Sequence, residues 1–148
     1  MPWMLMATGL LEGAALLTLL TVLWEPGTVV GATLGFGIVF ASVNATLWHR
    51  YRTTARGQGI KPLARAVLEA VTPWLHGVGH AAPLVFFILA FVSERNAGAW
   101  ALLAAACALA GGALWKIAVI TRACYQQGFR LDRLPRRGSG TYAASARI

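Results

Sequence analysis

Charged side chains are scarce in this sequence. Only 12% of its 148 residues are Asp, Glu, Lys or Arg, and only 5 of these are acidic. A soluble domain carries about 25% charged residues. With 57% hydrophobic residues, a chain of this length has more apolar surface than a water-exposed fold could bury. A soluble globular domain is therefore excluded.

Cysteines and catalytic groupings are also lacking. The two cysteines are Cys107, inside an apolar run, and Cys124, just after one. Two such positions provide neither a disulfide framework nor the ligand spacing of a metal site. No nucleophile–base pair and no phosphate-binding loop can be recognised. We therefore expect no catalytic residue and no metal ligand in this chain.

Four long apolar runs account for most of the sequence. They predict membrane-spanning helices over residues 2–24, 27–48, 73–93 and 100–120. As a helix, the first run would be roughly 33 Å long, which matches the hydrocarbon core of a bilayer. We therefore predict an all-α fold: a four-helix transmembrane bundle within residues 1–122, followed by a basic cytoplasmic tail over residues 123–148.

Residues 61–72 form an amphipathic pattern between the second and third runs. Their apolar side chains recur every four residues, at Leu63, Val67 and Val71. The pattern is typical of an interfacial helix that lies on the lipid headgroups. We expect Pro73 to break this helix and to begin the third span, because proline lacks the backbone N–H that continues a helix. Pro83 is expected to kink that span.

Small residues predict where the helices pack. Glycines recur every four residues in the second span, at Gly27, Gly31 and Gly35. A face without side chains allows another helix to approach closely, so this face is expected to be a packing surface. The first half of the fourth span, which is nearly all Ala and Leu, predicts a second one.

Basic residues are distributed unevenly among the connections. The net charge is +8, and most Lys and Arg follow the second span or lie in the tail, whereas the opposite turns carry Glu25, Glu94 and Arg95. The positive-inside rule therefore places both termini in the cytoplasm, in agreement with an even number of spans. Because topology and anionic lipid already account for the positive charge, we expect the lipid bilayer and no nucleic acid as a partner.

Five polar side chains are predicted to lie inside the spans, in the half nearer the cytoplasm. Glu12 is the deepest, at about 15 Å by helical rise. The others are His76, Asn44, Lys116 and His80. A charged residue at the centre of a span costs roughly 2.5–3.5 kcal/mol on insertion scales, so such residues mark function more often than chance. The candidates for proton or ligand handling are Glu12, His76, His80 and Lys116.

Each of these residues also has a structural interpretation. Lys116 lies close enough to the interface to extend its amine to the headgroups. Asn44 can hydrogen-bond to another helix. His76 and His80 share a helix face and are compatible with satisfied core histidines. Glu12 is the hardest to explain structurally; it would be neutral, or paired with Lys116 or His80.

A haem site is not expected. A bis-histidine haem takes its two ligands from opposite faces of the ring, usually from two helices. His76 and His80 share one face of one helix, and the third histidine, His49, lies at the surface end of the second span.

Two stretches carry a recognisable pattern. One covers residues 115–140, where the pattern consists of Thr121–Ala123, Tyr125–Phe129, Leu134–Pro135 and Arg137–Gly138; the other is ATGLLEGAALL, residues 7–17. The first resembles the end of the membrane anchor subunits of molybdenum oxidoreductases, such as the dimethyl-sulfoxide-reductase anchor and the polysulfide-reductase membrane subunit. The second resembles the helix that opens the second half of such anchors.

The resemblance implies an electron-transfer role in anaerobic respiration. Such an anchor lies in the bacterial inner (cytoplasmic) membrane and holds an iron–sulfur subunit and a molybdopterin catalytic subunit. It binds a quinone, menaquinone or ubiquinone, and passes electrons between the quinone pool and the iron–sulfur partner. This chain would then be a non-catalytic subunit of an oxidoreductase complex. Candidate contacts with a partner or with lipid are Arg122, Tyr125, Arg130, Arg136 and Arg137.

The chain is shorter than these anchors, which usually have twice as many helices. It resembles their C-terminal half, so it is expected to be a fragment or to pair with a separate N-terminal half. The family's quinone contacts lie largely in the other half, so none is transferred; Glu12, His76, His80 and Lys116 are quinone or proton candidates from their depth alone. Two alternatives fit the sequence: a small proton-coupled transporter that uses Glu12, and a structural scaffold.

Overall fold

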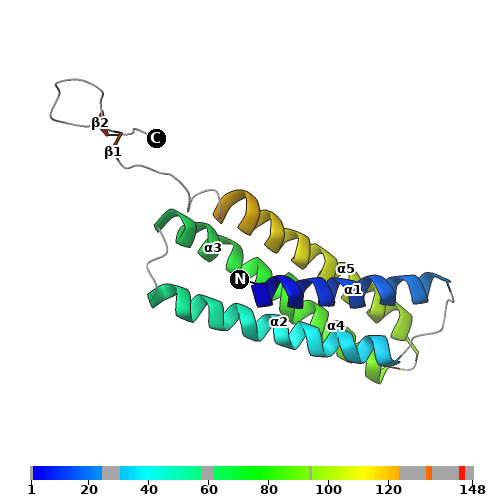
Figure 1. Ribbon diagram of the computed structural model, residues 1–148. Helices are drawn as coiled ribbons and strands as arrows, with labels where there is room; N and C mark the ends of the chain where they lie inside the picture. Colours follow the sequence, from blue (N-terminus) through cyan, green and yellow to red (C-terminus); the bar gives the residue numbers. More distant parts are fainter. Residues whose placement is uncertain are drawn as a thin grey trace.

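The computed structural model describes residues 2–24, 31–57, 62–93, 95–123, 133–134 and 144–145. Its helices are α1 (Pro2–Trp24), α2 (Gly31–Gly57), α3 (Pro62–Trp74), α4 (Ala82–Val92) and α5 (Ala97–Ile117), with two π-helical segments, η1 (Leu75–Ala81) and η2 (Ala118–Ala123). The segments α3, η1 and α4 follow one another directly, as do α5 and η2, so the chain forms four helical rods (Figure 1).

The four rods are long and apolar enough to cross a membrane, over Trp3–Trp24, Gly31–Thr54, Ala64–Val92 and Ala97–Thr121. The predicted all-α four-helix bundle is confirmed. The first span has the predicted bounds. The second helix continues to Gly57, nine residues beyond the predicted end at Trp48, while residues 27–30 lie outside the described part of the chain. The fourth helix begins at Ala97, ahead of the predicted residue 100.

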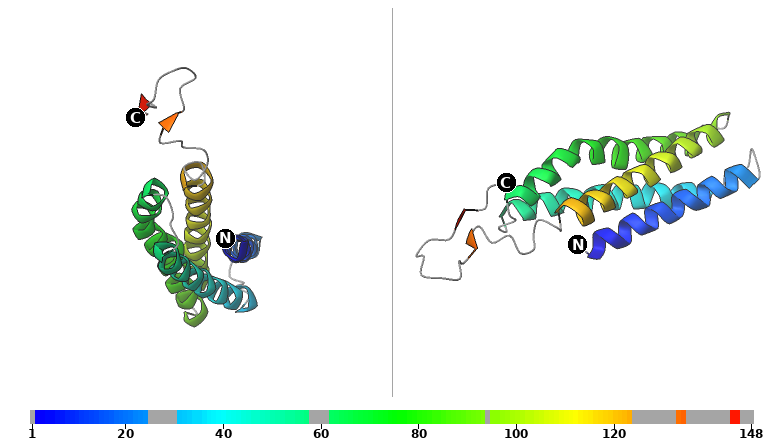
Figure 2. Two further views of the ribbon diagram at one scale, coloured as in Figure 1. Left: turned by 60° about the vertical axis from the view of Figure 1, so that its left-hand side comes forward. Right: turned by 90° about the horizontal axis from the view of Figure 1, so that it is seen from above.

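The rods form a closed ring in which each packs on two neighbours. Helix α1 packs on α2 and α5, and α4 packs on the same two helices from the other side. Helix α1 begins, α2 ends, α3 begins and η2 ends at one end of this ring, which we call the basic end (Figures 1 and 2). The described Arg50, Arg52 and Arg65 lie toward it. The beginning and the end of the bundle are thus on the same side, as an even number of spans requires.

Small residues fill the centre of the bundle. Helix α5 buries one face made of alanine and glycine: Ala101, Ala104, Ala105, Ala108, Gly111 and Gly112. In a membrane, helices associate through close van der Waals packing rather than through the hydrophobic effect, so small side chains stabilise the contact. The packing surface predicted in the first half of the fourth span is therefore confirmed.

The glycine face predicted in α2 is wrong at the positions that can be checked. A Cβ atom added to Gly35 would meet nothing within 4 Å, and one on Gly31 would only touch Phe91 at 4.0 Å. Close approach occurs instead at Gly37, where a Cβ atom would lie 2.7 Å from the ring of Phe87. The ring of Phe87 is fully buried there. Gly27 lies outside the described residues.

The predicted break at Pro73 does not occur. Proline 73 is inside α3, which continues through η1 into α4 and forms part of the third span. A mid-helix proline leaves the carbonyl four residues earlier without its N–H donor, here that of Glu69. Both residues are exposed, so the unpaired carbonyl is not buried. The expected separate interfacial helix is therefore the amphipathic first part of the third rod, where α3 packs against η2.

The distortion expected at Pro83 lies in the turns before it. Residues 75–81 adopt π-helical hydrogen bonding, and the N–H of Ala82 bonds to the carbonyl of Gly77, five residues back. Prolines on either side lack N–H donors, and local changes of helical register are a known way for membrane helices to accommodate them. Figure 2 shows that this rod curves between its two ends.

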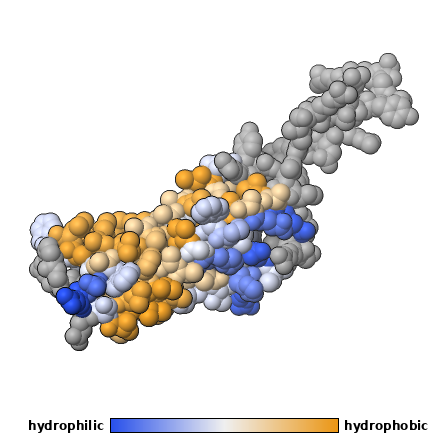
Figure 3. All heavy atoms as spheres, turned by 180° about the vertical axis from the view of Figure 1, so that it is seen from behind, coloured by the Kyte–Doolittle hydropathy of each residue, from blue (hydrophilic) through white to orange (hydrophobic). Residues whose placement is uncertain are grey.

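The outer surface of the bundle is mainly hydrophobic. Figure 3 shows hydrophobic residues over most of one side, with hydrophilic residues at the two ends and more of them toward the basic end. Exposed side chains include Trp3, Leu20, Phe91, Ile117 and Ile120. The surface is that of a bundle surrounded by lipid.

In the tail, Arg133–Leu134 (β1) pairs antiparallel with Ala144–Ser145 (β2).

Candidate functional site

An ion pair joins the first span to the last. The ammonium of Lys116 donates to Oε2 of Glu12. Glycine 112, one turn before Lys116, makes room, because a Cβ atom there would overlap the Glu12 carboxylate. The side chains are 17% exposed for Glu12 and 38% exposed for Lys116. Of the two partners predicted for Glu12, the structure places Lys116 against it.

The histidine pair forms a second polar group. Oriented by the π-helical turn of η1, the rings of His76 and His80 lie edge to face with their centroids 5.9 Å apart. Nε2 of His76 lies 3.2 Å from Nη1 of Arg52, in α2. Arginine can only donate, so Nε2 of His76 accepts and its proton is on Nδ1. The side chains of Arg52, His76 and His80 thus form a row of contacts that leads from the basic end into the bundle.

His80 is the more deeply buried of the two histidines. It is 5% exposed, and neither ring nitrogen has a hydrogen-bond partner among the described residues. Its neighbour Gly79 lies against Gly111 of α5, where a Cβ atom on Gly111 would overlap the Gly79 backbone. This backbone-to-backbone crossing of η1 and α5 fixes the position of His80. The interpretation of His80 as a satisfied core histidine is not supported by these contacts.

Asn44 links α2 to α1. The hydroxyl of Thr8 has two acceptors within reach, Oδ1 of Asn44 at 3.2 Å and the carbonyl of Met4 at 2.8 Å, and its one proton is shared between them. Both Thr8 and Asn44 are buried. Asn44 therefore has the role of an interhelical hydrogen-bonding residue, as its structural interpretation predicted.

Two tryptophans that the sequence analysis did not select belong to this region. Trp48 and Trp115 are buried in one cluster at the basic end, and the N–H of neither indole has a partner among the described residues. The cluster also contains Met4, Leu68, Leu75 and Val119. A tryptophan at the end of a span is normally an interfacial anchor with a wet N–H. Their burial can only be seen once the helices are assembled.

Several predicted contact residues cannot be placed. Tyr125, Arg130, Arg136 and Arg137 lie outside the described residues, as does the side chain of Arg122 at the end of η2. Within the described part of the chain, no three His, Cys, Asp or Glu side chains come together to hold a metal ion.

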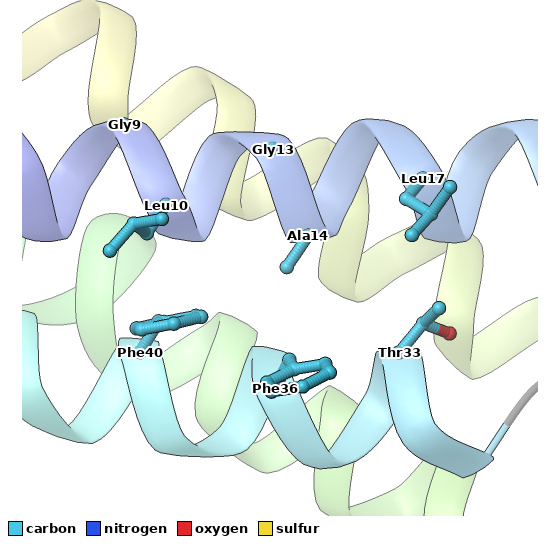
Figure 4. Close-up of a pocket in the computed structure, with 8 residues that line it drawn as sticks. All are labelled: Gly9, Leu10, Gly13, Ala14, Leu17, Thr33, Phe36 and Phe40. Carbon is cyan, nitrogen blue, oxygen red and sulfur yellow. The ribbon is translucent and has the colours of Figure 1, made fainter.

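An apolar groove runs along the outside of the bundle between α1 and α2. One part has a volume of about 290 Å³ and is lined by Gly9, Gly13, Phe36 and Phe40, among others (Figure 4). A second part, of about 330 Å³, shares Leu10 and Phe40 with it. The side chains that line the groove are nearly all apolar, so it suits a hydrocarbon chain rather than a polar headgroup.

Comparison with protein-family models, with curated proteins and with solved structures finds no match to this chain. Its class therefore rests on its own structure. The four apolar rods and the hydrophobic outer surface define a multi-pass α-helical membrane protein. Inside it, polar groups from all four rods are gathered in the half nearer the basic end.

Proposed function

We propose that this chain is a quinone-interacting membrane anchor subunit of a molybdenum and iron–sulfur oxidoreductase complex, with both termini in the cytoplasm of a bacterium. The observation that carries the proposal is the Glu12–Lys116 ion pair inside two membrane spans, in the same half of the bundle as the histidine pair. The resemblance of residues 7–17 and 115–140 to such anchors supports it.

The chemistry of a quinone requires such groups. Reduction of a quinone to its quinol takes two electrons and two protons, and oxidation of the quinol releases them. In the proposed complex, the iron–sulfur partner exchanges the electrons, and this chain supplies or removes the protons. A carboxylate and an imidazole are the side chains best suited to that task. Glu12 can take a proton in place of its bond to Lys116, and His80 has free ring nitrogens.

The pairing of Glu12 also bears on the transporter alternative. A small exporter that uses one membrane-embedded acid needs that acid free to bind a proton or a cationic substrate in turn. Here the ammonium of Lys116 already occupies the carboxylate. A cationic substrate would have to displace Lys116 from Glu12, so the pair disfavours cation binding at this acid.

The test is isolation of the chain from native membranes in a mild detergent, followed by mass spectrometry and molybdenum and iron analysis. We expect a molybdopterin subunit and an iron–sulfur subunit to co-purify. In that complex, Glu12→Gln and His80→Ala should each lower quinol turnover by at least about tenfold, because each removes a proton-transferring group. Assembly and metal content should not change.

Glu69→Gln is the matched control, since Glu69 is an exposed acid on α3, and turnover should not change. Recovery of the chain alone would contradict the proposal and make proton-coupled transport the leading alternative. A complete complex whose turnover tolerates both substitutions would indicate a structural scaffold.

A further inference from the structure

Buried hydrogen-bonding groups without partners are rare in proteins, and each one calls for an explanation such as a ligand or a bound water. In the described part of this chain, four such atoms are found, and all lie toward the basic end: Trp48 Nε1, Trp115 Nε1, and Nδ1 and Nε2 of His80. All three side chains are at least nine-tenths buried.

The three side chains occupy one region of the bundle. Trp48 of α2 and Trp115 of α5 belong to the same packed cluster, together with Leu75 of η1. Trp115 is one turn beyond Gly111, and Gly111 lies against Gly79, the neighbour of His80. Three different rods therefore contribute these side chains to the part of the bundle around the crossing of η1 and α5.

The chemistry of the three groups defines what they can bind. An indole N–H can only donate, and a neutral imidazole donates once and accepts once. The cluster therefore offers three donors and one acceptor. A ligand that satisfies it must present oxygen acceptors, and it must reach the interior of a bundle that lipid surrounds. A flat, lipid-soluble carbonyl compound has both properties.

We propose that Trp48, Trp115 and His80 bind the carbonyl oxygen of a quinone headgroup. The inference rests on the proposed function and deepens it, because it separates the residues that hold the headgroup from the Glu12–Lys116 pair. In this arrangement, the indole N–H groups donate to the carbonyl oxygen and hold the ring in place. The N–H of His80 donates to the same headgroup, and His76 and Arg52 lead from there to the basic end.

The experiment uses the six tryptophans of the full chain, purified in detergent micelles with ¹⁵N-labelled indoles. Trp48→Phe and Trp115→Phe each keep an aromatic ring, remove one donor and assign one indole N–H resonance. Menadione or a short-tailed ubiquinone is then added. We expect the Trp48 and Trp115 resonances to shift, while those of the exposed Trp24 and Trp74 stay in place. A hydrocarbon with the same tail and no oxygen should shift none of the four.

Affinity provides a second measurement. Each Trp→Phe change at positions 48 and 115 should weaken quinone binding roughly threefold to tenfold, the value of one hydrogen bond. Trp24→Phe is the control and should bind like the wild type. If the wild type binds quinone but neither indole resonance moves, the inference is overturned, the cluster holds water only, and the proposed function stands. If the wild type binds no quinone, both this inference and the proposed function are contradicted.

Discussion

The two halves of the bundle use polar groups in different ways. In the half away from the basic end, the hydroxyls of Thr18 and Thr21 bond to carbonyls of their own helix, at 2.8 and 2.9 Å. Toward the basic end, bonds within one helix also occur, as from Thr72 to Leu68, but polar groups there bond between helices as well, as in the Glu12–Lys116 pair. A polar group that hydrogen-bonds within its own helix costs little free energy and does not determine how the helices are arranged. One that needs another rod fixes the arrangement of the bundle and remains available for chemistry.

The packing differs in the same way. The core in the far half is made of alanine and leucine with a few larger side chains such as Phe87. The core at the basic end contains Trp48 and Trp115, whose N–H groups have no partner among the described residues. One half is thus built for close contact, and the other has features of a binding site. Three paired substitutions test this difference.

The largest effect is expected where backbones cross. Gly111→Ala places a Cβ atom into the backbone of Gly79, and neither rod can yield without moving the other. We expect the free energy of unfolding, measured by SDS titration in mixed micelles, to fall by about 3 kcal/mol. Gly35→Ala in the far half meets nothing within 4 Å and should be neutral or slightly stabilising. Equal stability of the two variants would contradict the close crossing.

The ion pair should show the next largest effect. Lys116→Met leaves the Glu12 carboxylate without its partner, which we expect to cost about 2 kcal/mol, less than for a fully buried pair because Lys116 is partly exposed. The double variant Glu12→Gln with Lys116→Met removes both charges and should recover most of that loss. A double variant no more stable than the single one would show that the pair does not couple the two spans.

The smallest effect distinguishes bonds between helices from bonds within one. Asn44→Leu removes the contact with Thr8 and should lower the free energy of unfolding by about 1 kcal/mol. Thr18→Val removes a hydroxyl that donates to the carbonyl of Ala14 in its own helix, so the change should be a few tenths of a kcal/mol at most. The same SDS titration measures both, and the difference between them would vanish if the two halves were equivalent.

Sequence reasoning located the four spans, because long apolar runs follow directly from bilayer thickness. It was wrong about Pro73. A membrane helix can continue past a proline when neighbouring helices, hydroxyl side chains, water or a local change of register accommodate the freed backbone group, and the π-helical segment η1 directly follows the helix that contains Pro73. A distortion near Pro83 was predicted, but its position in the turns before the proline and its π-helical form were not, since sequence rules do not specify which turns change register.

The candidate site was predicted in part. Depth alone selected Glu12, His80 and Lys116, and it left open which partner Glu12 takes. That choice depends on Gly112, whose missing side chain allows the carboxylate to lie against α5. Trp48 and Trp115 were missed because a tryptophan at the end of a span has the same sequence signature whether its N–H is in water or buried. Their roles require the assembled bundle.

The partners of the ion pair are 104 residues apart, and this separation has a consequence for biogenesis. At translation rates of about 5–20 residues per second, Lys116 is synthesised roughly 5–20 s after Glu12. During that time the first span holds an acid with no counter-ion. Its insertion is therefore provisional until the last span arrives. A chain that stops early leaves an unpaired acid in the membrane, a defect that the cell's proteases can recognise.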